Sequence, residues 1–224
     1  MSAPFRQGRM PCGLDQCKQF VYACCMIRSF ADRETERLFA TGTTRRLPQD
    51  IVRRAIGRLQ HLHLATRVED LRKPPSNHLE ALKGDRAGQW SIRINDQWRL
   101  CFRFEGGDAF DVGVVDYHRG AAYMSIPATK NGLPPIHPGE LLEEILQDLD
   151  MSQTAFARVI GVSPMRISHV IRGERPVTAE LALRFGRAFG QAPQMWLNWQ
   201  TDYDLKIAER ELKASLRKVQ RLAA

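Results

Sequence analysis

Long apolar runs are missing from this sequence. Hydrophobic residues make up 43% of the chain, yet charged residues interrupt them so often that no stretch approaches the roughly 20 apolar residues of a membrane-spanning helix. The apolar stretch 20–26 is too short for the core of a signal peptide and has no clear cleavage site after it. We therefore expect a cytoplasmic protein without a membrane partner.

Cysteine is almost absent after residue 25. Cys101 is the exception, and the other four cysteines are Cys12, Cys17, Cys24 and Cys25. They have neither the paired C-x-x-C spacing nor the neighbouring histidines that a zinc site needs. We therefore expect no metal ion and no other cofactor. Residues 1–25 also lack any hydrophobic period, so we interpret them as a disordered tail with free thiols.

Acidic residues are outnumbered by basic ones. The chain holds 33 Lys and Arg against 25 Asp and Glu, a net charge of +8 that suits a nucleic-acid partner. Residues 1–123 carry a net charge of +6 and residues 124–224 only +2. The more basic half is the one without the DNA-binding motif described below, so DNA alone does not explain the charge.

The first half of the chain predicts a small α+β domain over residues 26–118. Its second helix is amphipathic, with Arg53, Arg54 and Arg58 on the side opposite the apolar face. The last three strands are joined by two good hairpin turns, which predicts an antiparallel sheet. The expected elements are a strand at 26–30, helices at 32–40 and 49–64, and strands at 89–94, 98–104 and 110–116.

The second half predicts an all-α domain over residues 138–224. Residues 119–137 hold small residues, prolines and a glycine, which is typical of a linker. The expected helices are 138–148, the two helices of a motif at 151–172, 177–189 and 193–205.

Residues 151–172 predict a helix-turn-helix. Ser152 and Ser163 are good N-caps, Ala157 lets two helices cross closely, and Gly161 suits a sharp turn because glycine tolerates positive φ. An ordinary αα-hairpin obeys the same packing rules. The outward-facing side chains favour DNA binding, because such groups reach phosphates and base edges in a major groove. They are Gln153, Thr154, Ser163, Met165, Arg166, Ser168 and His169.

An apolar stripe follows in the segment 204–222. Its members recur at helical spacing and are Leu205, Ala208, Leu212, Leu216 and Val219. Such a stripe pairs with a second copy, docks on the other domain or, most often, closes the core of its own domain. We expect the last of these.

Two sets of motifs resemble a toxin–antitoxin pair. The strings HPGELLEEIL, RPVTAELALRFGRAFG and PQMWLNWQTDYDL, with the helix-turn-helix between the first two, closely resemble HigA-type antitoxins. The strings LRKPPSNHLEALKGDRAGQWSIRINDQWRLCFRF and VVDYH resemble a HigB toxin of the RelE superfamily. The two resemblances cover residues 26–118 and about 124–206. They imply a RelE-like sheet domain followed by a lambda-repressor-like helical domain.

The resemblance also implies activities and partners. HigB-type toxins cleave mRNA on the ribosome, and HigA-type antitoxins bind their toxin and repress their own operon. We therefore expect the ribosome, mRNA and operator DNA as partners, a toxin–antitoxin contact in cis or in trans, and a homodimer formed through the antitoxin domain. Toxin and antitoxin are usually separate chains, whereas here they are joined.

Metal-independent RNA cleavage needs a proton carrier and cations that stabilise charge on the phosphate. Asp116, Tyr117 and His118 close the last strand, where His118 exchanges a proton near neutral pH and Tyr117 stacks or donates. Arg99 on the middle strand is the best phosphate clamp. The supporting cations are Lys83 in the catalytic group, and Arg86, Arg93, Arg53 and Arg54 as RNA contacts.

Three classes of function stay open on these grounds. The first is a toxin–antitoxin fusion with a nuclease domain held silent by a DNA-binding domain. The second is a transcriptional repressor whose toxin-like domain is catalytically inactive. The third is an RNA-binding protein without cleavage. An intact Asp-Tyr-His motif with Arg99 favours the first, and the continuation of the chain after His118 favours the second.

Overall fold

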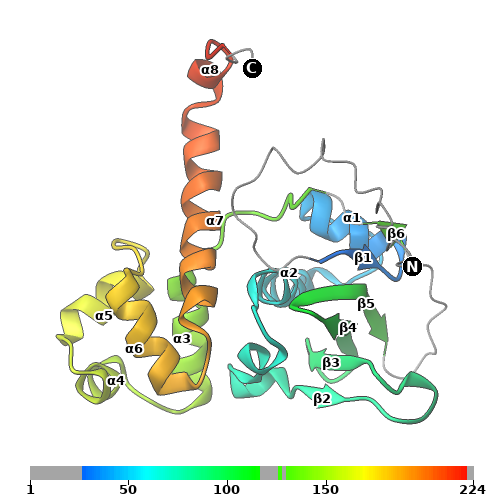
Figure 1. The fold of residues 1–224 in the computed structure, drawn as a ribbon, viewed down its shortest axis with the longest axis horizontal. Coiled ribbons are helices and arrows are strands. Elements are labelled where there is room, and N and C mark those ends of the chain that lie inside the picture. The colour runs from blue at the N-terminus through cyan, green and yellow to red at the C-terminus, as the bar shows by residue number, and fades with distance from the viewer. Residues whose placement is uncertain (1–26, 117–125, 128–129, 221–224) are drawn as a thin grey trace, which may run out of the picture.

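The computed structural model describes residues 27–116, 126–127 and 130–220. The expected tail, the residues Tyr117 and His118, and the first part of the expected linker lie outside the described residues. Figure 1 shows a sheet domain and a helical domain side by side, with the long helix α7 (Pro193–Glu211) standing between them and projecting beyond both.

The sheet has six strands in the order β2-β3-β4-β5-β1-β6. All neighbouring strands pair antiparallel except β1 and β5, which are parallel. The α+β fold class is confirmed, and the three long strands lie within two residues of their expected bounds. The strands are β1 (Ser29–Phe30), β2 (Glu80–Ala81), β3 (Trp90–Arg93), β4 (Trp98–Glu105), β5 (Asp108–Asp116) and β6 (Ile126–Pro127).

Helices α1 (Arg33–Thr41) and α2 (Gln49–Leu64) cover one face of this sheet. Side chains alternate along a strand, so Trp98, Leu100 and Phe102 of β4 point into the core beneath the helices. The residues between them point to the opposite face. Short 3-10 helices η2 (Val68–Arg72) and η3 (Pro75–Asn77) connect α2 to β2, and η4 (Gly84–Arg86) lies between β2 and β3.

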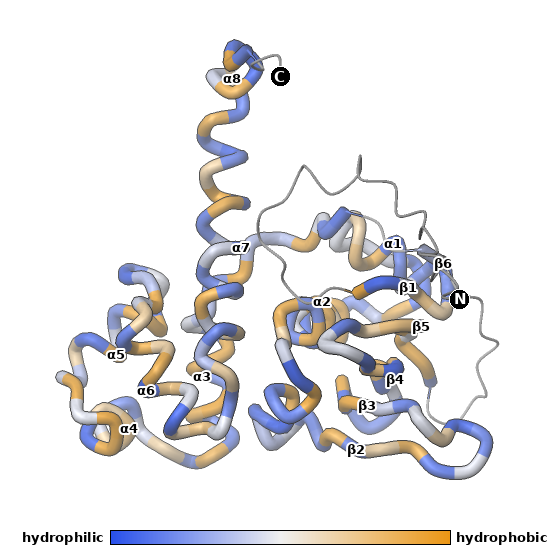
Figure 2. The backbone as a smooth tube through the Cα atoms, in the orientation of Figure 1, coloured by the Kyte–Doolittle hydropathy of each residue, from blue (hydrophilic) through white to orange (hydrophobic). Residues whose placement is uncertain are grey.

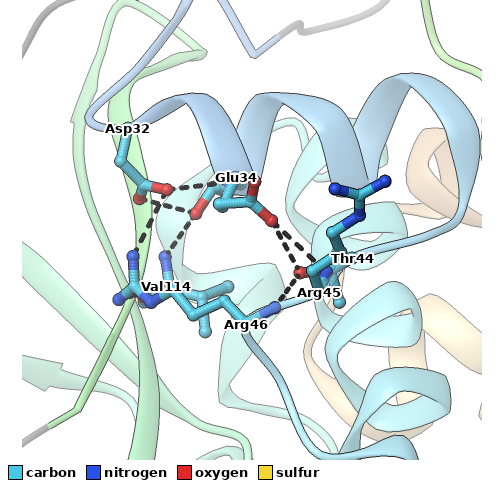
Figure 3. A network of polar contacts seen from close by, with 7 residues as sticks. Asp32, Glu34, Thr44, Arg45, Arg46 and Val114 are labelled. Carbon is cyan, nitrogen blue, oxygen red and sulfur yellow. Dashed lines mark hydrogen bonds and ion pairs between the residues drawn. The ribbon is translucent and has the colours of Figure 1, made fainter.

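The loop between α1 and α2 is fixed by polar contacts (Figure 3). Arg46 donates to the carbonyl of Val114 at 2.7 Å and pairs with Asp32, the N-cap of α1. Glu34 accepts from the Thr44 hydroxyl at 3.2 Å. The Arg46 guanidinium thus connects the loop to β5 and to the start of α1.

Part of the segment expected as a linker belongs to the sheet domain. Strand β6 pairs with β1, and Leu133 lies in the sheet-domain core with 3% of its surface exposed. The Gly132 amide donates to Phe39 O at 3.0 Å, and a Cβ on Gly132 would lie 1.7 Å from Ala40 O. Only glycine therefore allows this close approach to α1.

The helical domain is built as the sequence predicts. The side chains of His137, Ser152, Ser163 and Thr178 each accept a backbone N–H at the start of a helix, and Gly161 turns the chain with φ of 68°. Aromatic rings, among them Phe156, Phe185 and Trp196, fill the core. Its helices are α3 (Pro138–Asp148), α4 (Gln153–Ile160), α5 (Pro164–Ile171), α6 (Ala179–Phe189) and α7. The predicted helix-turn-helix is confirmed in α4 and α5.

The C-terminal stripe does not close the core, so that expectation is wrong. Helix α7 runs six residues beyond its predicted end at Leu205, and the short α8 (Lys213–Leu216) follows. Leu205, Leu212, Leu216 and Val219 are all about half exposed or more. Polar and apolar residues alternate along this projecting segment (Figure 2). The physical reason is length, because a helix that continues past the core carries its apolar stripe into solvent.

Candidate nucleic-acid interfaces and the contact between the domains

Arg99 lies on the sheet face opposite α1 and α2. It stands across from Arg93 on β3 and from Val115 on β5. Its Nη1 donates to Glu80 Oε2 at 2.7 Å and to Ser91 Oγ at 2.8 Å, and 15% of its side chain is exposed. The predicted clamp is thus present with a carboxylate already bound to it.

Of the predicted supporting cations, Arg86 and Arg93 lie on the same face as Arg99. Arg93 shares it with Arg99 and forms an ion pair with Asp96. Arg86 lies against Cys101 of the same face, where burial raises the pKa of the thiol. Lys83 is exposed just before η4. The structure therefore brings Arg86, Arg93 and Arg99 to one face.

Asp116 lies on the other side of the sheet from Arg99. It stands opposite Trp98, a core residue, and accepts from Gln97 Nε2 at 2.9 Å. Because neighbouring residues of a strand point to opposite faces, Asp116 does not share the Arg99 face. Tyr117 and His118 lie outside the described residues, so their roles stay predictions.

Two of the three arginines of α2, Arg53 and Arg58, pair with the helical domain. Arg58 has 2% of its surface exposed, and its guanidinium donates to the Glu144 carboxylate at 3.0 and 2.7 Å. The expectation that Arg58 lies on a solvent-facing side is wrong, because α3 covers it. Arg53 pairs with Glu140 of α3 at 3.0 Å, and Arg54 donates to the carbonyl of Ile94 at 3.2 Å.

A second part of the interdomain contact surrounds Asp70 of η2. This carboxylate is fully buried and accepts from the amides of Thr66, Arg67 and Ala192, the last at 2.7 Å from the helical domain. Gln191 donates to the Asp70 carbonyl, also at 2.7 Å. The two domains are therefore joined in cis by hydrogen bonds that the buried Asp70 carboxylate and carbonyl accept from the helical domain.

The centre of the contact is apolar and holds two buried histidines. Leu64 of α2 packs into the helical-domain core, and the His61 ring lies 5.6 Å from the Trp199 ring. Burial lowers the pKa of His61 to about 3 and that of His63 to about 4, and Arg58 adds to the shift at His61. Both imidazoles are therefore neutral near pH 7.

The interdomain residues were missed from the sequence, although a signal was present. Glu140, Glu144 and Asp148 recur every four residues along α3, which places three carboxylates on one helical stripe. Each of them contacts the sheet domain, Asp148 through the backbone amide of Ser76 at 2.8 Å. Such a stripe matches the basic side of α2.

The predicted DNA-reading residues lie on α4, on α5 and at the N-cap of α5, and none of them is buried in the core. Met165, Thr154 and Ser163 are exposed, and Ser163 also caps α5. Among the partly buried ones, Arg166 pairs with Glu180 at 2.9 Å and His169 lies 3.7 Å from Glu174. The partly buried group is Gln153, Arg166, Ser168 and His169. A hollow of about 460 Å³ lies between α5 and the start of α6.

Neither a membrane span nor a metal cluster was found where the chain is described. No helix there is long and apolar enough to cross a membrane. No three or more His, Cys, Asp and Glu side chains of residues 27–116, 126–127 and 130–220 form a group that would hold a metal ion.

Comparison with known proteins divides the chain at the same place as the fold. The model of the RelE-like toxin HigB of type II toxin–antitoxin systems matches residues 28–118, and a helix-turn-helix model matches residues 142–195. The chain is 40% identical over 93 residues to Endoribonuclease HigB of Proteus vulgaris, which covers 42% of this chain and all of that protein. It is 53% identical over 89 residues to Virulence-associated protein I of Dichelobacter nodosus, covering 39% of this chain and 82% of that protein.

A solved structure also matches the second half. It is the Pseudomonas aeruginosa antitoxin HigA with the higBA promoter, at 35% identity, with a TM-score of 0.39, covering 40% of this chain and all of that one. A toxin-like sheet domain joined to a helix-turn-helix domain defines a toxin–antitoxin protein. The chain belongs to the HigB family of RelE-like toxins through residues 28–118 and carries a helix-turn-helix domain in the same polypeptide.

Proposed function

We propose that the sheet domain is a ribosome-dependent mRNA endonuclease that the helical domain holds silent in cis. The observation that carries this proposal is the contact between α2 and α3, in which Glu140 and Glu144 engage Arg53 and Arg58 of the basic helix. Arg58 of this basic helix is thereby buried and kept from ribosomal RNA, and the charge of Arg53 is paired with a carboxylate. The name of the Proteus vulgaris relative, an endoribonuclease, supports the activity.

The cleavage step assigns separate tasks to the predicted residues. The 2′-hydroxyl gives its proton to His118 as its oxygen attacks the neighbouring phosphorus, a 2′,3′-cyclic phosphate forms as the bond to the 5′-oxygen breaks, and the 5′-oxygen takes up the proton. His118 carries the proton, Tyr117 stacks on a base or donates, and Asp116 orients them. Arg99 stabilises the phosphate charge once RNA replaces Glu80 on its guanidinium, with Lys83, Arg86 and Arg93 as supports.

We also propose that the helical domain binds a palindromic operator as a homodimer and represses its own operon. Two recognition helices α5 about 34 Å apart read half-sites one helical turn apart. The support is the confirmed helix-turn-helix with polar side chains on its outer surface.

A reversal of one interdomain charge tests the proposal of silencing. Glu144→Arg places a cation against the buried Arg58, which opens the contact, whereas Glu143→Arg changes an exposed neighbour by the same charge. Reporter mRNA is incubated with ribosomes in a cell-free translation system, and new 5′ ends are mapped by primer extension. Glu144→Arg should cleave and Glu143→Arg should match the intact chain. Equal cleavage by all three proteins would contradict silencing in cis.

A repressor with an inactive toxin domain is the second candidate. The Glu80 carboxylate on Arg99 favours it, because it occupies the atoms that would hold a phosphate. The same assay separates the candidates. An inactive domain gives no ribosome-dependent cleavage even when Glu144→Arg opens the contact.

A further inference from the structure

Arg166 of the recognition helix is held by the first turn of the next helix. Its Nη2 lies 2.9 Å from Glu180 Oε2 and 3.4 Å from Thr178 Oγ1, the N-cap oxygen of α6. About a third of the Arg166 side chain and half of the Glu180 side chain are exposed. The pair therefore sits at the edge of the surface that faces DNA, beside the hollow between α5 and α6.

The Glu180 carboxylate is itself fixed by a second arginine. Arg184 Nε donates to Glu180 Oε1 at 3.0 Å, and Arg184 Nη1 donates to the carbonyl of Ile160 at the end of α4. Arg166 and Arg184 lower the pKa of Glu180, so the carboxylate stays ionised. One chain of hydrogen bonds thus runs from α4 through α6 to the guanidinium on α5.

This arrangement is not explained by stability or by affinity. An exposed ion pair contributes little to folding. A carboxylate near the phosphate backbone also weakens binding to any DNA, because it opposes the attraction of the basic side chains. A third effect of the pair is that it fixes the orientation of the Arg166 guanidinium. A guanidinium that is already oriented loses less conformational freedom when it binds a base.

We propose that Glu180 is a positioning residue that orients Arg166 toward one base pair in each half-site. Glu180 holds Nη2 at 2.9 Å, whereas the contact of Nη2 with Thr178 is long, at 3.4 Å. Nη2 has two N–H bonds, so the one not held by Glu180 forms an end-on fork with Nη1 once the base replaces Thr178. A guanine presents two acceptors, O6 and N7, in the matching geometry. The partner is therefore a G·C base pair in the major groove. This inference rests on the proposed operator binding.

The test begins with DNA selection by the full chain. A duplex library with a random centre is enriched by the wild-type protein, and the selected site is then altered one base pair at a time. Fluorescence anisotropy gives the preference for each base pair with wild type, Arg166→Ala, Glu180→Gln and Glu180→Asp. Glu143→Gln, an exposed carboxylate on α3, is the control for the change in charge.

We expect Arg166→Ala to lower the preference for one G·C pair by roughly 5- to 150-fold, the range for a bidentate contact. Glu180→Gln should lower the preference at the same pair and leave the others intact, and Glu180→Asp should restore part of it. In the Arg166→Ala background, Glu180→Gln should have no further effect on base preference. Glu143→Gln should match wild type at every pair.

Three outcomes overturn the inference. Glu180→Gln keeping full preference at the pair that depends on Arg166 would show that Glu180 does not orient it. An equal change in affinity for every duplex would show that Glu180 acts through charge alone. Arg166→Ala without any loss of preference would remove the reader itself. If the wild-type chain enriches no sequence, operator binding fails, and that result is distinct from the other three.

Discussion

Arg58 and Glu144 lie 86 residues apart in sequence and are joined by two hydrogen bonds of 3.0 and 2.7 Å across the domain boundary. Only 3% of the Arg58 side chain is exposed, against 33% for Glu144. A buried arginine without its carboxylate is costly, so the pair couples the folding of the sheet domain to the docking of the helical domain.

Glu144→Gln should destabilise the chain by about 3 kcal/mol, at the lower end of the range for breaking a buried pair, because Glu144 itself is partly exposed. The free energy of unfolding in urea measures this. Glu143→Gln, on the exposed side of the same helix, should change it by less than about 0.5 kcal/mol. Equal values for the two variants would contradict the assigned role of the pair.

Arg99→Ala should lower ribosome-dependent mRNA cleavage by about 10²–10³-fold, measured in a chain whose interdomain contact has been opened. Arg103→Ala is the matched control, because Arg103 lies on the same strand and pairs with Asp111 and Glu105 away from Glu80. Glu80→Gln should strengthen RNA binding, since RNA no longer displaces a carboxylate from Arg99. A weaker affinity of Glu80→Gln for an RNA oligonucleotide would count against this competition.

His118→Gln should lower the same cleavage by about 10²–10⁴-fold, the loss typical of a missing general acid or base. Tyr117→Phe should have a small effect if the ring only stacks and a large one if the hydroxyl gives a proton. Primer extension on a reporter mRNA measures both. Wild-type rates for His118→Gln and Arg99→Ala together would refute the catalytic assignment.

Stability should fall as the pH drops below about 6.5. In the folded state the pKa is about 3 for His61 and about 4 for His63, against 6.5 for a histidine in the unfolded chain. Below pH 6.5 the unfolded chain therefore binds more protons than the folded chain. Their stabilisation is fully present above pH 6.5 and is lost as the pH falls toward 3. Each histidine lowers the free energy of unfolding by up to about 1.4 kcal/mol for each pH unit in this range.

Urea unfolding at pH 7, 6 and 5 measures this slope. His61→Phe should reduce it, because the aromatic contact with Trp199 remains and the titrating group is gone. His78→Gln, at an exposed position, should leave it unchanged. A slope that is the same in all three proteins would contradict a role for the buried histidines.

Gly132→Ala should strongly destabilise the chain, because its Cβ would lie 1.7 Å from Ala40 O. Gly57→Ala is a sharp control, since Gly57 lies inside α2 and a Cβ there meets nothing within 4 Å. Alanine favours a helix over glycine, so this variant should gain about 0.5–1 kcal/mol. Thermal unfolding measures both changes: the melting temperature should fall for Gly132→Ala and rise for Gly57→Ala.

Local chemistry made most elements predictable. The serine caps at Ser152 and Ser163 and the turn at Gly161 act within a few residues, so the sequence alone predicted α4 and α5. Helix α2 also ends at the predicted Leu64. The burial of Arg58 depends on Glu144, a residue 86 positions away, and the acidic stripe on α3 does not by itself identify which basic surface it meets.

The candidate sites were predictable only in part. The face shared by Arg99 and Arg93 follows from strand alternation and register. The ion pairs of Arg99 with Glu80 and of Arg166 with Glu180 were not predicted. Glu80 lies on an edge strand, and Glu180 lies on the helix that follows the helix-turn-helix. The length of α7 was also missed, since its last turns have no core beneath them to mark an end.

Because β6 and Leu133 are built into the sheet domain and α3 begins at Pro138, the connection between the two domains is residues 134–137. Four residues reach about 13–14 Å at full extension. If the contact between α2 and α3 opens, the helical domain stays within that reach, at an effective concentration that short linkers place near millimolar. Dilution or a loss of synthesis therefore does not remove the helical domain from the sheet domain in this chain. Under the proposed silencing, the sheet domain is released when a partner competes for α2.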